Sequence, residues 1–262
     1  MRNILNKIKI NNLTYLLFFI CVLSGLFKNV LLIFLIDIFH EFGHIFFIHK
    51  YNYKITSIDI YPFGGITKVE KDLNSPINHD LVIASAGFIF QFILFITFFF
   101  LNYLGFISVT TYNLFNTYNQ AIFLFNLLPI IPLDGFVILK GMLEKILTFK
   151  KVNCVVSIIS VLGIFFYVQY NYIYSLNNYM IITLLIYKTY MHIKNFNYTY
   201  NRFLLERYLN VYPYKKAKQE KMISFKNFRK ETLHFFKVGN RYVHEKEILK
   251  KKFDKNRHFW YN

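Results

Sequence analysis

The feature that most constrains this chain is a pair of histidines set in an apolar stretch, residues 30–50, VLLIFLIDIFHEFGHIFFIHK. On a helix with ~100° and ~1.5 Å per residue, His40 and His44 lie on one face, about 6 Å apart along the axis. That spacing suits two imidazoles that bind one zinc ion, with Glu41 beside them as general base. Polar titratable groups are costly in apolar sequence and are usually functional there. The stretch therefore predicts a metal site, although a polar cluster that includes Asp37 and satisfies itself is the alternative.

The composition places the chain among membrane proteins. It has 262 residues, of which 55% are hydrophobic and 21% aromatic. These values are too apolar for an ordinary soluble domain of this length. The two cysteines, Cys21 and Cys154, both lie in apolar segments, so neither a disulfide framework nor a cysteine-based zinc site is indicated.

Apolar runs predict an all-α membrane protein with six transmembrane helices. The runs cover residues 13–27, 30–47, 81–101, 112–131, 152–169 and 179–190. We interpret the first as a retained span, because no small-residue cleavage site follows it. Between the second and third runs, β-branched residues flank Pro62-Phe63-Gly64-Gly65, which predicts a small β-hairpin with a glycine turn.

The distribution of basic residues predicts that both termini lie in the cytoplasm (N-in/C-in). Lysines and arginines gather in the N-terminal segment, in the connections after the second and fourth spans, and in the tail. The opposite connections contain Lys28 alone. The positive-inside rule then places His40 and His44 in the cytoplasmic half of the second span.

The C-terminal tail contains most of the excess charge. From residue 195 onward the sequence contains 17 Lys and Arg and 6 Asp and Glu. This segment therefore has a net charge of +11, out of +17 for the whole chain. A basic segment beside a membrane meets the anionic headgroups of membrane lipids. No nucleic-acid-binding motif accompanies the charge, so direct nucleic-acid binding is not expected. We therefore predict a membrane domain over residues 1–194 and a basic cytoplasmic tail over residues 195–262.

The carboxylate of Asp134 is the candidate third ligand. A catalytic zinc site uses three protein ligands and one water. Pro129 and Pro132 would unwind the end of the fourth span, and Gly135 permits a tight turn there. Asp134 could instead cap the amphipathic helix expected over residues 135–148. Its occurrence with the histidine pair at the same membrane depth favours the ligand interpretation.

Two motifs together, HExxH at residues 40–44 and NxxPxxPxDG at residues 126–135, resemble the site-2 protease family of intramembrane zinc metalloproteases. In order, spacing and size they are most similar to the sporulation branch of that family. The resemblance implies that His40, His44 and Asp134 bind Zn²⁺ and that Glu41 is the catalytic base.

The resemblance also implies that Asn126 and Pro132 shape the site and the substrate channel. Asn126 could equally satisfy the unwound backbone. The turn at Gly64 and Gly65 is similar to the family's membrane-associated hairpin near the active site, which either pairs with an extended substrate or is a structural flap. Two departures are visible: Phe88 follows Gly87 where many relatives have proline, and the short tail lacks the β-α-β pattern of a complete CBS domain.

For function, the resemblance implies hydrolysis of a membrane-associated protein on the cytoplasmic side, with pro-sigma-K as the substrate and inhibitory membrane proteins as partners. It implies residence in the membrane around the forespore, with the active site toward the mother-cell cytoplasm. Alternatives are a site-2 protease of another branch, which cleaves an anti-sigma factor or a signal-peptide remnant, a non-proteolytic metal transporter, and an inactive scaffold. Glu41 beside the ligands argues against the transporter.

Overall fold

The computed structural model describes residues 8–10, 12, 14–15, 19, 23–61, 64–170 and 176–254. Seven of the fifteen residues of the first predicted span, residues 13–27, lie outside these ranges. The chain divides into two compact units. The first unit comprises Met1–Lys71 and Leu81–Leu128, and the second comprises Asp72–Asp80 and Pro129–Asn262.

Three helices form the core of the first unit: α3 (Phe27–Lys50), α4 (Ile77–Tyr103, from Leu81 onward) and α5 (Val109–Leu127). Leu32 and Ile36 of α3 are buried with Leu94 and Phe115 in one apolar cluster. Small residues permit α3 and α4 to approach closely. A Cβ at Gly43 would lie 2.5 Å from the carbonyl oxygen of Ala86, so glycine is required there.

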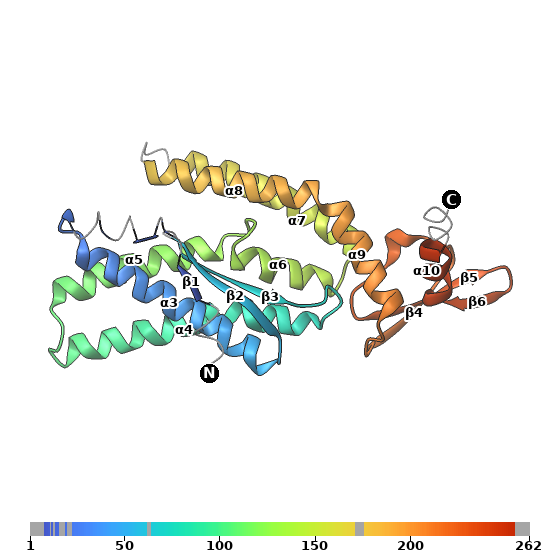
Figure 1. Ribbon diagram of the computed structural model, residues 1–262, viewed down its shortest axis with the longest axis horizontal. Helices are drawn as coiled ribbons and strands as arrows, with labels where there is room; N and C mark the ends of the chain where they lie inside the picture. Colours follow the sequence, from blue (N-terminus) through green and yellow to red (C-terminus); the bar gives the residue numbers. More distant parts are fainter. Residues whose placement is uncertain are drawn as a thin grey trace. The chain divides into compact units, whose positions relative to one another are not determined.

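The predicted hairpin is present in the first unit as β2 (Lys54–Tyr61) and β3 (Gly64–Glu70), which pair antiparallel (Figure 1). A short strand that was not predicted, β1 (Ile8–Ile10), pairs parallel with β2, so the strand order is β1-β2-β3. Ile55 and Ile58 of β2 are buried against Ile48 of α3. The hairpin is therefore packed on the helix that carries the two histidines.

The second unit contains the helices α6 (Asp134–Glu144), α7 (Phe149–Tyr170) and α8 (Leu176–Lys194). The amphipathic helix expected after the fourth span is α6, and its Phe136 packs with Val152 and Val156 of α7. Figure 1 shows α7 and α8 side by side along their length.

The remainder of the second unit is a folded C-terminal module, residues 196–254. It contains α9 (Phe196–Leu209), β4 (Lys216–Glu220), a 3₁₀ turn (Phe225–Asn227), β5 (Thr232–Val238), β6 (Arg241–His244) and α10 (Glu245–Asp254). β4 pairs parallel with β5, and β5 pairs antiparallel with β6. Phe203, Phe228, Phe236 and Leu249 are fully buried in its core. The protein is mostly helical, as predicted, and its described residues form two small sheets, of which the first contains the predicted hairpin and the second was not predicted.

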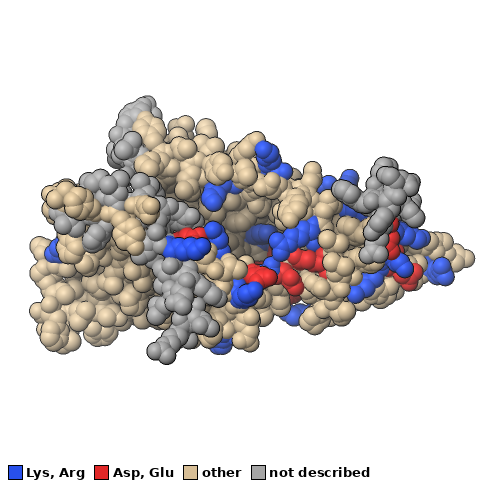
Figure 2. Space-filling model, viewed as in Figure 1, with Lys and Arg blue, Asp and Glu red and all other residues tan. Residues whose placement is uncertain are grey.

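Three of the described helices are long and apolar enough to cross a membrane: Phe27–Lys50, Ile77–Tyr103 and Phe149–Gln169. On the face that Figure 2 shows, Lys, Arg, Asp and Glu gather over the hairpin β2–β3 and the C-terminal module, and few lie at the left-hand end of the view. The protein is thus a membrane protein. The predicted six spans and the N-in/C-in orientation are not confirmed by these three helices.

The C-terminal module depends on a buried ion pair. Arg207 and Glu245 have fully buried side chains, 2.8 Å apart between Nη2 and Oε2, and Nη2 also donates to the carbonyl of Thr232. Replacing Arg207 by Met leaves the Glu245 carboxylate without its cation, and we expect a loss of about 3–5 kcal/mol of module stability. Hydrogen exchange of the β5 amides in the full chain measures this loss.

The control is Arg202→Met. Arg202 is half-exposed and pairs with Glu206 at 2.9 Å, so its replacement should cost no more than about 0.5 kcal/mol. Equal effects of the two substitutions would contradict the importance of the buried pair.

Candidate metal centre

His40 and His44 lie on the buried stripe of α3. Residues at intervals of four, Leu32, Ile36, His40, His44 and Ile48, are all buried, so the histidines take positions where apolar side chains would otherwise pack. Their rings are 4.8 Å apart between centroids and nearly perpendicular. Two buried imidazoles side by side fit a common metal ion better than an apolar core.

Helix α4 orients both imidazoles through their Nδ1 atoms. His44 Nδ1 is 2.7 Å from the carbonyl oxygen of Ile83, and His40 Nδ1 is 3.2 Å from Oε1 of the fully buried Gln91. Gln91 Nε2 in turn donates to the carbonyl of Asn119 at 2.8 Å, which fixes the orientation of the amide. Because both partners of the histidines are acceptors, each Nδ1 carries the proton and each Nε2 presents its lone pair. Outer hydrogen bonds of this kind are typical of metal-binding histidines.

Gly87 leaves room where the two Nε2 atoms converge. A Cβ at this position would lie 2.6 Å from Cε1 and Nε2 of His40 and 2.7 Å from Nε2 of His44. Any side chain there would displace the rings. The absence of a Cβ, the fixed Nδ1 protons and the all-nitrogen face of the pair fit a zinc ion.

The hairpin contacts the glutamate of the motif. Thr67 Oγ1 on β3 donates to Glu41 Oε2 at 2.9 Å. A Cβ at Gly65 would lie 2.8 Å from Cγ of Glu41, so β3 runs close along this side chain. Glu41 is therefore oriented from outside its own helix, by two residues of β3.

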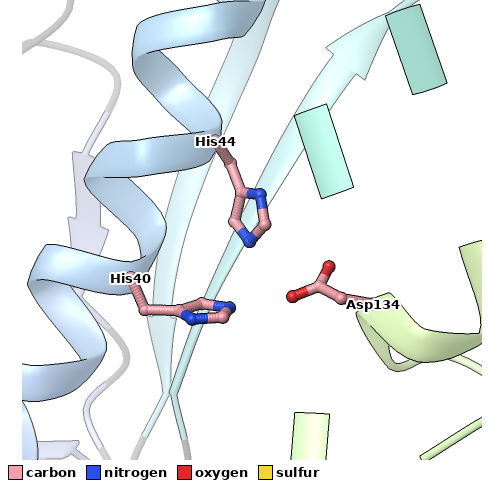
Figure 3. Close-up of side chains that lie close together, drawn as sticks. All are labelled: His40, His44 and Asp134. Atoms are coloured by element: carbon pink, nitrogen blue, oxygen red, sulfur yellow. The ribbon is translucent and has the colours of Figure 1, made fainter. Parts of the chain in front are cut away.

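Asp134 completes a group of three residues with metal-ligand atoms. The candidate ligand atoms of His40, His44 and Asp134 all lie within 4.8 Å of one another, and Figure 3 shows the carboxylate turned toward the two rings. Asp134 is the first residue of α6, and Leu133 occupies the N-cap position. Two nitrogen ligands and one carboxylate are a donor set that catalytic zinc uses.

The other predicted residues lie at three different places. Asn126 is in the last turn of α5, half-buried. Pro132 is exposed in the loop before α6 and follows a cis peptide bond. Gly64 is the first residue of β3. Their roles toward a substrate stay predictions.

Thr67, Ile83 and Gln91 were not predicted from the sequence. Gln91 had a signal, because it is the strongly polar residue of an otherwise apolar run and lies one helical turn after Gly87. The Ile83 carbonyl had none, since it is a backbone group. Thr67 could not be assigned without the strand register that brings β3 to Glu41.

Long apolar helices, two buried histidines with fixed tautomers, an adjacent glutamate and a nearby carboxylate are the features that a membrane-embedded zinc metalloprotease requires. Residues 28–112, the part of the chain that carries the histidine motif, match the model of Peptidase family M50. The predicted resemblance to the site-2 proteases is confirmed.

Two related proteins and one solved structure are also similar to this chain. The chain is 28% identical over 205 residues to Stage IV sporulation protein FB of Bacillus subtilis, an alignment that covers 77% of this chain and 71% of the relative. It is 30% identical over 145 residues to a zinc metalloprotease of Methanocaldococcus jannaschii, covering 51% of this chain and 42% of that protein. The solved structure of a site-2 protease from the same archaeon matches with a TM-score of 0.53 and 25% identity, covering 71% of this chain and 91% of that one. These relatives imply Zn²⁺ as the cofactor.

Gly87→Ala should remove the metal. The added Cβ overlaps both imidazoles, and we expect zinc affinity to fall at least ~10-fold, as for other disturbed outer contacts. Elemental analysis of the purified chain measures bound zinc. Gly163→Ala is the control, because its added Cβ would also crowd a buried side chain, that of Ile130, but would touch neither imidazole. Wild-type zinc content in Gly87→Ala would refute the assigned role of Gly87.

Thr67→Val should lower peptidase activity without changing zinc content. It removes the hydrogen bond to the Glu41 carboxylate, a loss of about 1.5 kcal/mol or roughly tenfold in rate. Thr67→Ser keeps the hydroxyl and should retain most of the activity. Cleavage rates of a membrane-tethered substrate separate the two variants, and equal rates for Val and Ser would show that the hydroxyl has no role.

Proposed function

We propose that this chain is an intramembrane zinc endopeptidase that cleaves a membrane-associated protein on the cytoplasmic side of the membrane. The observation that carries the proposal is the pair of buried imidazoles whose Nδ1 atoms face acceptors on α4, with Glu41 next to them on α3. A structural core would not need two buried histidines with their Nε2 atoms directed at the same small space.

In this proposal His40, His44 and Asp134 bind the metal. Bound zinc would polarise the scissile carbonyl and lower the pKa of the attacking water to near ~7. The remaining steps belong to the chain's own side chains. Glu41 accepts the proton of that water and passes it to the leaving amine as the peptide bond breaks. Thr67 keeps one carboxylate oxygen of Glu41 in position during both transfers.

A helical substrate must be extended before its peptide bond can react, and β3 offers a place for that. Among the described strands, β3 pairs with β2 on one side and has no strand on the other. A peptide added to this edge would run past Gly65 and Thr67, the residues that contact Glu41. We assign Gly64 and Gly65 to substrate binding on this basis, with Asn126 and Pro132 as residues that shape the channel.

Pro-sigma-K is the substrate that we propose, with inhibitory membrane proteins as further partners. The support is the similarity to Stage IV sporulation protein FB over most of both chains. The same similarity supports a location in the membrane around the forespore, with the site toward the mother-cell cytoplasm.

We also propose that the chain crosses the membrane six times, with both termini and the basic part from residue 195 in the cytoplasm. Loop charges support this orientation.

Glu41→Gln tests the function. The amide cannot accept the proton of the water, whereas the three ligands are unchanged. We therefore expect full zinc content and no cleavage when pro-sigma-K is co-expressed and its processing is followed by the change in its size on gels. Wild-type chain and His44→Ala are run beside it, and His44→Ala should lose both zinc and cleavage.

Three outcomes would point elsewhere. Processing by Glu41→Gln at the wild-type rate would reject Glu41 as base. Zinc binding with no processing of pro-sigma-K, but with cleavage of an anti-sigma factor or a signal-peptide remnant, would place the chain in another branch. Metal uptake into cells that depends on His44 but not on Glu41 would favour a transporter.

A further inference from the structure

The C-terminal module binds residues 72–80, the segment that connects β3 with the part of α4 that contacts the histidines. Residues 72–80 follow β3, which contacts Glu41, and include the first turn of α4, the helix that contacts both histidines. This segment and the module belong to the same compact unit. A shift of the segment would therefore be passed to β3 on one side and to α4 on the other.

Backbone and side chains of the segment are bound by α9. The amide of Leu73 donates to Glu206 Oε2 at 2.7 Å. The buried Asn74 donates to the carbonyl of Phe203 at 3.0 Å, and its Oδ1 is 3.5 Å from Nη1 of Arg207. These contacts attach the segment to the core of the module rather than to a surface loop.

Glu231 binds the first residue of α4. Its Oε1 accepts from the amide of Ile77 at 2.9 Å, one of the donors that a helix start leaves without an internal partner. A carboxylate there also faces the positive end of the helix dipole. Glu231 has φ of +54°, a left-handed conformation that is uncommon for a residue other than glycine. The module thus maintains an unfavourable backbone at the residue that caps α4.

Lys230, the neighbouring residue, joins α4 to α6. Its side chain is only 5% exposed, with Nζ 2.7 Å from Asp80 Oδ2 and 3.4 Å from Glu144 Oε2. Burial alone would lower the pKa of Lys230, but Glu144 and Asp80 together raise it above its usual value, so the ammonium stays charged. One buried cation neutralises two carboxylates from separate helices.

Both carboxylates lie on helices that carry parts of the centre. Asp80 is three residues before Ile83, whose carbonyl accepts from His44, and Glu144 is the last residue of the helix that begins with Asp134. We infer that Lys230 is a positioning residue for the peptidase centre, which sets α4 and α6 through Asp80 and Glu144. This inference rests on the proposed function, and it makes the basic C-terminal module a part of the enzyme's working structure.

The test compares full-length Lys230→Met and Lys230→Arg in detergent. Misplacement of catalytic groups by about 1 Å costs on the order of 100-fold in rate, so we expect kcat for pro-sigma-K cleavage to fall about 10- to 100-fold in Lys230→Met with KM little changed. Zinc release to a chelator should become roughly tenfold faster. Lys230→Arg keeps a cation between the carboxylates and should recover part of both values.

The matched control is Lys218→Met, which removes an exposed lysine of the same module that pairs with Glu220. It should behave as wild type. If Lys230→Met does not fold, the variant with Asp80→Asn and Glu144→Gln added removes the unpaired buried charges and provides the same comparison.

Two results would overturn the inference: wild-type kcat and zinc release in a folded Lys230 variant, or an effect on KM alone, which would indicate substrate docking. Failure of the proposed function is separate, because it would appear as wild-type chain without zinc or Glu41→Gln with full cleavage.

Discussion

The hydrogen bonds from α4 to the Nδ1 atoms of His40 and His44 are the interactions on which the centre depends. They decide which nitrogen of each ring carries a proton, and hence which nitrogen can bind a metal. They require α3 and α4 to lie close together, which the small residues at their contact permit. Membrane-helix packing and metal binding therefore both require that α3 and α4 lie close together.

A second layer of contacts surrounds that core. The hairpin β2–β3 is packed on α3 by buried isoleucines, and this packing brings Thr67 to Glu41. The segment after β3 is bound by the C-terminal module, whose own core contains a buried ion pair and stacked aromatic rings. A basic tail that composition alone would assign to a lipid surface is a folded unit with internal contacts to α4 and α6.

The histidine face, the hairpin and α6 could be predicted, because each leaves a periodic or turn-forming pattern in the local sequence. The second sheet could not. β4 reads KAKQE, with no apolar alternation, and it pairs in parallel with a strand 16 residues further along the chain. The outer partners of the histidines were also missed, since one is a backbone carbonyl, and the other is a glutamine whose polarity in an apolar run was a signal but whose contact with His40 depends on the α3–α4 packing. Local pattern predicts elements, whereas contacts between distant residues require the three-dimensional structure.

The close approach at Gly43 has a consequence for how this protein can evolve. Position 43 lies inside the HExxH motif, where the chemistry itself accepts any residue. In this chain a single methyl group there would collide with the main chain at Ala86. Backbone packing thus prevents substitution at this position between the two ligands. A glycine retained here through evolution would reflect the close contact of α3 and α4, and not a requirement of the reaction.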